Sequence, residues 1–128
     1  MMSKGIKRIP LTVENAGGLA RKAWPITQGV PFADRELRRG AKVRVVDSSG
    51  KRLPVQVSCL GTWKKDLKYV KWLLVDFQAD LGVDSTETFF LEYGSGVRAM
   101  RPRQGVSVSR EEGRLRVDTG VMRLDFRL

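Results

Sequence analysis

The feature that most constrains the fold is a series of short runs in which apolar and polar residues alternate, each ended by turn residues. In "IKRIPLTVEN" the alternation places Ile9, Leu11 and Val13 on one face of an extended chain, and "NAGG" then turns it. Side chains alternate between the two faces of a strand, whereas a helix needs apolar residues three and four positions apart. The pattern therefore predicts an all-β fold.

The segment "KVRVVDSSGKRLPVQVSCL" predicts a hairpin. Val43 and Val45 alternate with basic residues, "DSSGK" supplies the turn, and the alternation resumes at Leu53, Val55 and Val57. Between this hairpin and the strand before it, "FADRELRRG" is too short for a stable helix, and we expect a turn or a 3₁₀ segment there.

The run "YVKWLLVDFQA" has apolar residues at both odd and even positions. A strand of this kind is covered on both faces, so we expect it to be central in its sheet. One predicted face carries Tyr69, Leu73, Val75 and Phe77, and the other carries Val70, Trp72 and Leu74.

The strand pattern predicts one small β barrel or sandwich-like domain of about 7–9 short, mostly antiparallel strands. We place the N-terminal β-barrel domain at residues 1–103 and a C-terminal hairpin and strand at residues 104–128. Because the final run still alternates at Leu128, we expect residues 104–128 to begin a further region of a longer protein.

The charge is concentrated in the first half of the chain. The formal net charge is +10, and residues 1–65 hold fourteen Lys and Arg against four acids, whereas residues 66–128 hold ten against ten. Between Trp72 and Val97 there is no Lys or Arg. A basic surface of this kind attracts polyanions, although the same charge also serves solubility and contacts with neighbouring domains.

Several chemistries are excluded by composition. The chain has no histidine, which removes Ser-His and Cys-His nucleophiles and histidine metal sites, and its lone cysteine, Cys59, cannot form an internal disulfide. We predict no cofactor and no metal. No apolar run approaches the ~20 residues that a membrane helix needs, and the N-terminus lacks the apolar segment of a secretory signal, so the sequence gives no compartment.

The carboxylates do not predict a catalytic centre. The nearest candidates for a glycosidase pair are Asp76 with Asp80 and Glu111 with Glu112. Asp76 shares a predicted strand face with Trp72, whereas the glutamates lie in a hairpin turn and are expected to be solvated. The turn "GSG" lacks the lysine and helix of a phosphate-binding loop. We therefore predict no catalytic residue.

Cations and aromatic residues are interleaved around the predicted hairpin and the strand after it, as in proteins that bind single-stranded nucleic acid. The residues are Arg38, Arg39, Lys42, Arg44, Lys51, Arg52, Lys64, Lys65, Lys68 and Lys71, with Trp63, Tyr69 and Trp72. Since Tyr69 and Trp72 fall on opposite predicted faces, at least one of them is expected in the core.

Several short motifs, in order, resemble the N-terminal RIFT-type barrel domain of the exo-rhamnogalacturonan lyases and YetA-like proteins. They are Thr12, Val13 and Asn15; Gly29, Val30 and Pro31; Asp47, Gly50, Leu53, Pro54 and Gln56; Trp63, Asp66, Lys71 and Trp72; and Leu73 to Phe77. The match covers nearly the whole chain, and it departs at "WKKDLKYVKW", where a longer basic insert replaces the usual turn between the tryptophans.

The resemblance implies a noncatalytic β domain at the front of a larger polysaccharide lyase, in which a separate α/α-barrel domain cleaves acidic pectic sugars. The partners it implies are an acidic polysaccharide and other domains of the parent protein. For carbohydrate binding we select Trp63, Lys64, Lys65, Lys68 and Lys71. A nucleic-acid-binding β barrel and a purely structural assembly domain remain the alternatives.

The stretch "WPITQGVPF" raises a separate question, because its composition suits either a sugar-stacking loop with Trp24 as the platform or a strand at a sheet edge. In the family pattern it is a strand. We therefore expect Gly29 to supply an unusual backbone angle and Pro31 to end the pairing at an edge.

Overall fold

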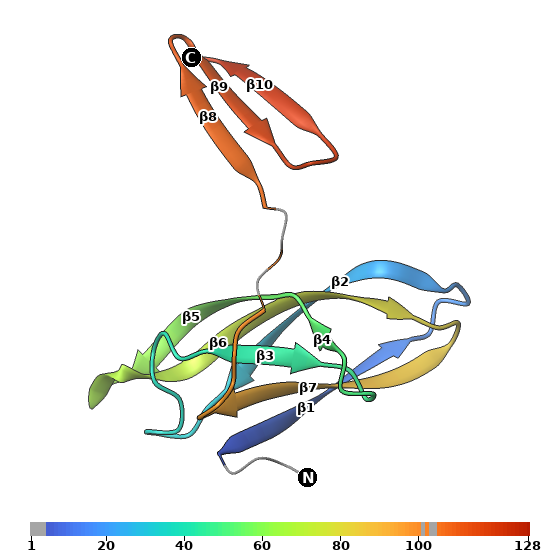
Figure 1. The fold of residues 1–128 in the computed structure, drawn as a ribbon, viewed down its shortest axis with the longest axis vertical. Coiled ribbons are helices and arrows are strands. Elements are labelled where there is room, and N and C mark those ends of the chain that lie inside the picture. The colour runs from blue at the N-terminus through green and yellow to red at the C-terminus, as the bar shows by residue number, and fades with distance from the viewer. Residues whose placement is uncertain (1–4, 101, 103–104) are drawn as a thin grey trace.

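The computed structural model describes residues 5–100, 102 and 105–128. These residues form ten strands and no helix, so the all-β prediction is confirmed (Figure 1). Two antiparallel sheets make the body, and a third sheet is formed by the C-terminal residues. The expected turn after residue 31 is confirmed, since the backbone N–H of Glu36 donates to the carbonyl of Ala33.

The first sheet has four strands in the order β1-β7-β3-β4. Their bounds are β1 (Ile6–Asn15), β7 (Ser85–Gly94), β3 (Val43–Val46) and β4 (Arg52–Leu53). β1 and β3 both pair antiparallel with β7, so one row of the sheet runs through Arg8, Glu92 and Arg44. β7 is therefore the strand that holds this sheet together.

The second sheet has three strands in the order β2-β6-β5. Their bounds are β2 (Arg21–Pro31), β6 (Asp66–Leu81) and β5 (Val55–Trp63). The prediction that the run from Tyr69 is a central strand is confirmed, because β6 pairs with both neighbours.

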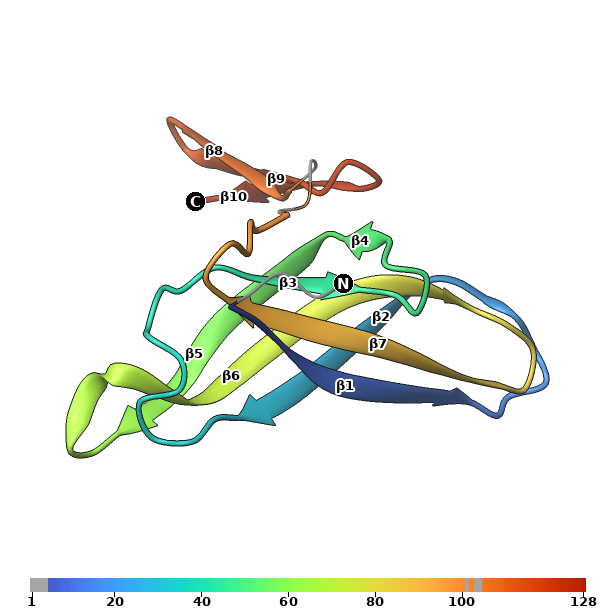
Figure 2. The ribbon, with the colours of Figure 1, turned by 60° about the horizontal axis from the view of Figure 1, so that its bottom comes forward.

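The two sheets face each other and enclose the core, in a sandwich-like arrangement rather than a closed barrel (Figure 2). Pro54 lies between β4 and β5, where the chain passes from one sheet to the other. On the opposite side the edges of β1 and β2 have no ladder between them within the described residues, and a slot of about 280 Å³ lies there. The return strand of the expected hairpin is divided between the two sheets at Pro54, since it pairs with β3 only at Arg52 and Leu53.

The core consists of the apolar residues that alternate inward along the strands. The central ones are Val43, Val45, Val55, Leu73, Val75, Phe77, Phe89 and Leu91. The rings of Phe77 and Phe89, one from each sheet, meet edge-on with centroids 5.3 Å apart. Cys59 is half-buried against this core.

The prediction that β6 is covered on both faces is wrong. Leu73, Val75 and Phe77 are buried, but on the other face Leu74 is half-buried, Asp76 is exposed and Trp72 is 45% exposed. Tyr69 is half-buried, so neither aromatic belongs to the hydrophobic core. The three-stranded sheet therefore buries one face in the core, and its other face is partly exposed.

The stretch from Trp24 to Phe32 forms most of β2, an edge strand, as expected. Pro31 is its last residue, but the pairing continues one step further, because the N–H of Phe32 donates to the carbonyl of Lys71. The expectation for Gly29 is wrong, since its φ is not among the positive ones. Its lack of a side chain instead leaves space beside Trp72, whose Cε3 would lie 3.8 Å from an added Cβ.

The C-terminal residues form a separate sheet in the order β10-β9-β8. The strands are β8 (Ser107–Glu111), β9 (Arg114–Asp118) and β10 (Arg123–Arg127). The expected hairpin around "EEG" joins β8 to β9, with Gly113 at a φ of 71°. These strands raise the total above the expected 7–9.

Candidate binding surface at the end of the β5–β6 hairpin

The turn between β5 and β6 carries the basic insert that distinguishes this chain from the family pattern. β5 ends at Trp63 and β6 begins at Asp66, so Lys64 and Lys65 form the exposed turn. The Asp66 carboxylate accepts a hydrogen bond of 3.0 Å from the backbone N–H of Lys68. The turn is thus a defined short connection, and both its lysines point to solvent.

The segment after β2 runs beside this hairpin and adds further cations. The N–H of Arg39 donates to the carbonyl of Lys68 at 2.7 Å, and the N–H of Val70 donates to the carbonyl of Leu37 at 2.8 Å. Arg38 forms a β-bridge with Tyr69. Two loops that are far apart in sequence therefore meet at one end of the sandwich, which we call the basic tip: Arg38, Arg39, Trp63, Lys64, Lys65, Lys68, Tyr69 and Lys71 (Figure 2).

Trp63 stabilises the basic tip and is also a candidate contact for a ligand. Its indole N–H donates a hydrogen bond of 3.2 Å to the carbonyl of Phe32, which ties the hairpin to the segment after β2. The ammonium of Lys71 lies 4.9 Å from the ring centre, a cation–π contact. A sugar could therefore contact Lys71 directly, but it could stack on the Trp63 ring only if it displaced the Lys71 ammonium.

The cations of the basic tip have no acidic partner in the described part of the chain. The ion pairs found there involve Lys7, Arg8, Arg44, Arg116 and Arg123, none of which belongs to the tip. Arg38 instead lies over the Tyr69 ring, 5.7 Å from its centre. Six like charges held on two connected loops produce a positive field that an anionic ligand would relieve.

Glu36 fixes the segment after β2 against the first sheet. It accepts hydrogen bonds from the Lys7 ammonium at 2.7 Å and from the Tyr93 hydroxyl at 2.8 Å. The hydrogen bond from Lys7, followed by that from Tyr93, lowers the pKa of Glu36. Burial, followed by the hydrogen bond to Glu36, raises the pKa of Tyr93 to about 12. This acid is therefore already engaged and does not neutralise the tip.

The predicted carbohydrate-binding residues are brought together by this geometry, since Trp63 and the four lysines all lie on the β5–β6 hairpin. Trp72 was named from the sequence among the aromatic residues interleaved with the cations, but it was not selected for carbohydrate binding. Its exposure and its position next to Lys71 place it beside the basic tip.

The carboxylates considered for catalysis do not form a pair. Asp76 accepts a hydrogen bond of 3.1 Å from the Thr27 hydroxyl, and Asp80 accepts one of 2.7 Å from the N–H of Ala23. Ala23 has a φ of 47° at a register shift in β2, so Asp80 stabilises that irregular backbone. Glu111 and Glu112 are exposed at the β8–β9 turn.

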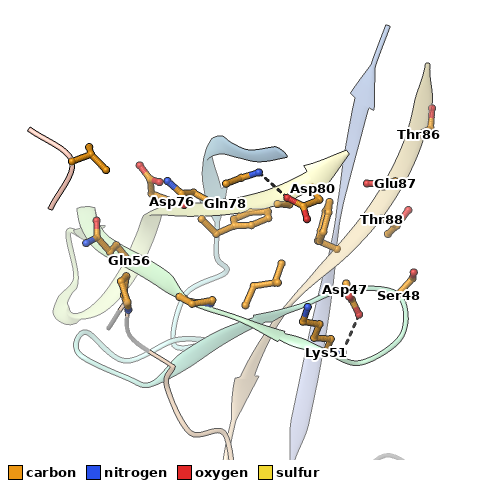
Figure 3. Close-up of a pocket in the computed structure, with 18 of the residues that line it drawn as sticks. Asp47, Ser48, Lys51, Gln56, Asp76, Gln78, Asp80, Thr86, Glu87 and Thr88 are labelled. Atoms are coloured by element: carbon orange, nitrogen blue, oxygen red, sulfur yellow. Dashed lines mark hydrogen bonds between the residues drawn. The ribbon is translucent and has the colours of Figure 1, made fainter. Parts of the chain in front are cut away.

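An open groove of about 1250 Å³ lies on the acidic side of the body (Figure 3). Asp47, Asp76, Asp80 and Glu87 line it, with Lys51 as the cation among its lining residues. Asp47 is occupied in its own turn, where it accepts hydrogen bonds from the N–H groups of Ser49 and Lys51. The acids come from three separate segments, the turn after β3, strand β6 and strand β7, so only the fold brings them together.

Within the described residues, no group of three or more His, Cys, Asp or Glu side chains is arranged to hold a metal ion. No helix in the same part of the chain could span a membrane.

No family model, curated protein or solved structure matches the chain. The likeness to the lyase domain therefore continues to rest on the sequence motifs alone.

Proposed function

We propose that this chain is a noncatalytic β domain of a polysaccharide-lyase-like protein, and that its basic tip binds an acidic polysaccharide. The observation that carries the proposal is a set of cations on one hairpin, Lys64, Lys65, Lys68 and Lys71, that form no ion pair with the acids the structure describes. Carboxylates spaced along a galacturonate chain would pair with several of these ammonium groups at once.

The hairpin is anchored well enough to act as a surface. Trp63 is bonded to Phe32, and the segment carrying Arg38 and Arg39 is paired with β6 and held by Glu36. Cations on anchored loops lose less conformational freedom when a ligand binds, which favours affinity. The contacts are solvent-exposed, so we expect weak binding that decreases as salt increases.

The test is calorimetry with polygalacturonate at low and moderate salt. Changing the four lysines to glutamine should weaken binding at least tenfold and reduce its salt dependence. A matched control removes four exposed cations elsewhere, Lys22, Arg52, Arg110 and Arg127, and keeps the same net charge. If both variants bind equally, or if the unmodified chain does not bind at all, the proposal is wrong.

Single-stranded nucleic acid is the second candidate, and the exposure of Trp72 beside the tip is the observation that favours it. Bases stack on such aromatic side chains, and phosphates pair with the cations around them. A gel shift with oligothymidine at ~50 mM salt tests this reading, since the electrostatic contribution is strong there. If neither polymer binds, the hypothesis of a purely structural assembly domain is favoured.

A further inference from the structure

Trp72 lies on the open face of the three-stranded sheet, next to the basic tip. Along β6 the residues that alternate with it and face the core, Leu73 and Val75, are 5% and 0% exposed, whereas Trp72 is 45% exposed. Its partners across the sheet are Pro31 on β2 and Gly61 on β5. Neither neighbour has a long side chain, so these two partners leave part of the indole exposed.

Two glycines contribute to this uncovered surface. Gly61 stands opposite Trp72, and an added Cβ there would meet no atom within 4 Å. On the other side, a Cβ added at Gly29 would lie 3.8 Å from Cε3 of the indole, an ordinary van der Waals contact. The sequence thus provides both the ring and the space around it.

Trp72 differs from the other two tryptophans in what covers its ring. The Arg21 guanidinium lies 4.2 Å from the ring centre of Trp24, and the Lys71 ammonium lies 4.9 Å from that of Trp63. In the part of the chain that the structure describes, Trp72 takes part in no cation–π or aromatic pair. A large, exposed indole without an intramolecular partner offers a flat apolar surface to a ligand.

The cation nearest in sequence lies at the edge of this surface. The β5 ladder pairs Gly61 with Trp72 and Thr62 with Val70, so it skips Lys71. Because of this irregularity two consecutive residues, Lys71 and Trp72, are both exposed. An exposed ring and a cation therefore stand at consecutive positions of β6, with the Lys71 ammonium 4.9 Å from the Trp63 ring centre.

A polar row lies further along the same face, where Thr27, Asp76 and Gln56 are opposite one another on the three strands. It is four residues from Trp72, or roughly 13 Å along the strand. Asp76 and Gln56 can accept hydrogen bonds from hydroxyl groups, but the Asp76 carboxylate repels anions. A ligand with both an acid group and hydroxyls would thus place its acid toward Lys71 and its hydroxyls toward Asp76.

We propose that Trp72 is a stacking platform for one pyranose ring of a uronic-acid-containing polymer, with Lys71 positioned to pair with the carboxylate of that ring or its neighbour. The apolar face of the sugar would lie on the indole, and the chain would continue toward the basic tip rather than toward Asp76. This inference rests on the proposed function, since it concerns the same ligand, but it predicts a contact that electrostatics alone does not require.

The experiment is calorimetry of the full chain with a defined oligogalacturonate, comparing Trp72→Ala with Trp24→Ala. Trp24 is equally exposed at 44% but is covered by Arg21. Trp72→Ala should bind about tenfold more weakly, as expected for the loss of one aromatic stacking contact, with an unchanged salt dependence. Trp24→Ala should bind as the unmodified chain does. Trp72→Phe, which keeps an aromatic face, should restore most of the affinity.

A second measurement reports on the ring itself. A variant with Trp24→Phe and Trp63→Phe leaves Trp72 as the one tryptophan of the chain. Its fluorescence should shift in wavelength or intensity as the same oligogalacturonate is added. Circular dichroism of each variant checks that the sheet content is retained.

The outcomes separate the two proposals. If the oligosaccharide binds and Trp72→Ala has no effect on affinity, the stacking inference is overturned and the basic tip stands. If the unmodified chain binds no oligogalacturonate, both are overturned. If oligothymidine binding depends on Trp72 whereas uronide binding does not, the platform serves bases and the sugar inference is also overturned.

Discussion

The chain contains two groups of cations, and they differ in whether an acid pairs with them. In the four-stranded sheet, Arg8 and Arg44 flank Glu92 in one row, with ion-pair distances of 2.7 and 2.6 Å, and Glu92 is only 2% exposed. At the basic tip, six cations have no acidic partner within the described residues. Cations of the first kind are part of the fold, and those of the second kind remain available to a ligand.

The supply of acids explains the difference. Glu92 belongs to the stretch from Trp72 to Val97, which has acids but no Lys or Arg, and β7 places it between two basic strands. At the tip the nearby acids are already engaged: Asp66 bonds its own turn, and Glu36 is held by Lys7 and Tyr93. The tip therefore keeps a net positive charge, because its six cations outnumber these two acids and neither carboxylate forms an ion pair with them.

The largest expected effect comes from removing the buried acid. Glu92→Gln leaves Arg44, whose side chain is only 11% exposed, without a counter-charge. Removing one partner of a buried ion pair costs about 3–5 kcal/mol, and because glutamine can still accept hydrogen bonds we expect about 3 kcal/mol. Urea unfolding measures this loss. Glu14→Gln, an exposed acid of β1, is the control and should change the free energy of unfolding by less than about 0.5 kcal/mol.

The same variant should change the response to acid. Burial would raise the pKa of Glu92, but hydrogen bonds and charge from Arg44 and Arg8 outweigh it and hold the pKa below 4.5. A carboxyl with a lowered folded pKa stabilises the fold fully above its ordinary pKa, and this contribution is lost as the pH falls through the folded value. Stability should therefore decrease below about pH 4.5 less steeply in Glu92→Gln than in the unmodified chain. Equal slopes would mean that Glu92 does not control acid unfolding.

An intermediate effect is expected where the tip is attached to the sheet. Tyr93→Phe removes one hydrogen bond to Glu36 and should cost about 1 kcal/mol. Because the pKa of Tyr93 is raised from 10.0 to about 12, the folded state favours the neutral phenol. Its contribution is complete below pH 10.0 and is lost as the pH rises toward 12. Alkaline unfolding followed in urea should therefore be less steep in Tyr93→Phe, and a slope equal to that of the unmodified chain would contradict this account.

The strand pattern was sufficient to predict much of the fold. Alternation predicted the all-β class and the inward face of β1, and the apolar run from Tyr69 predicted the central place of β6. One point could not be predicted from the pattern. A single proline, Pro54, divides the expected return strand between two sheets, and whether a proline ends a strand or only kinks it depends on what the neighbouring strands pair with.

The candidate site was predicted in part. The four lysines and Trp63 are close in sequence and lie on one hairpin, so they could be predicted from local sequence alone. Arg38 and Arg39 join through backbone pairing between distant segments, and the exposure of Trp72 depends on a sheet that packs with one face only. An apolar run looks the same whether its second face meets a protein layer or a ligand, and that ambiguity led to the wrong expectation for Trp72.

The smallest effect on stability should come from the tip lysines, which sharpens the comparison with Glu92. Replacing Lys64, Lys65, Lys68 and Lys71 with glutamine removes the Lys71–Trp63 contact, worth about 0.5–1 kcal/mol at an exposed site, but also relieves repulsion among like charges. These effects oppose each other, so we expect the free energy of unfolding to change by no more than about 0.5 kcal/mol. Raising the salt concentration screens the repulsion and should make the variant slightly less stable relative to the unmodified chain. Urea unfolding at two salt concentrations measures both. A loss above about 1 kcal/mol that does not depend on salt would mean that these lysines, like Arg44, are part of the fold rather than a surface kept for a ligand.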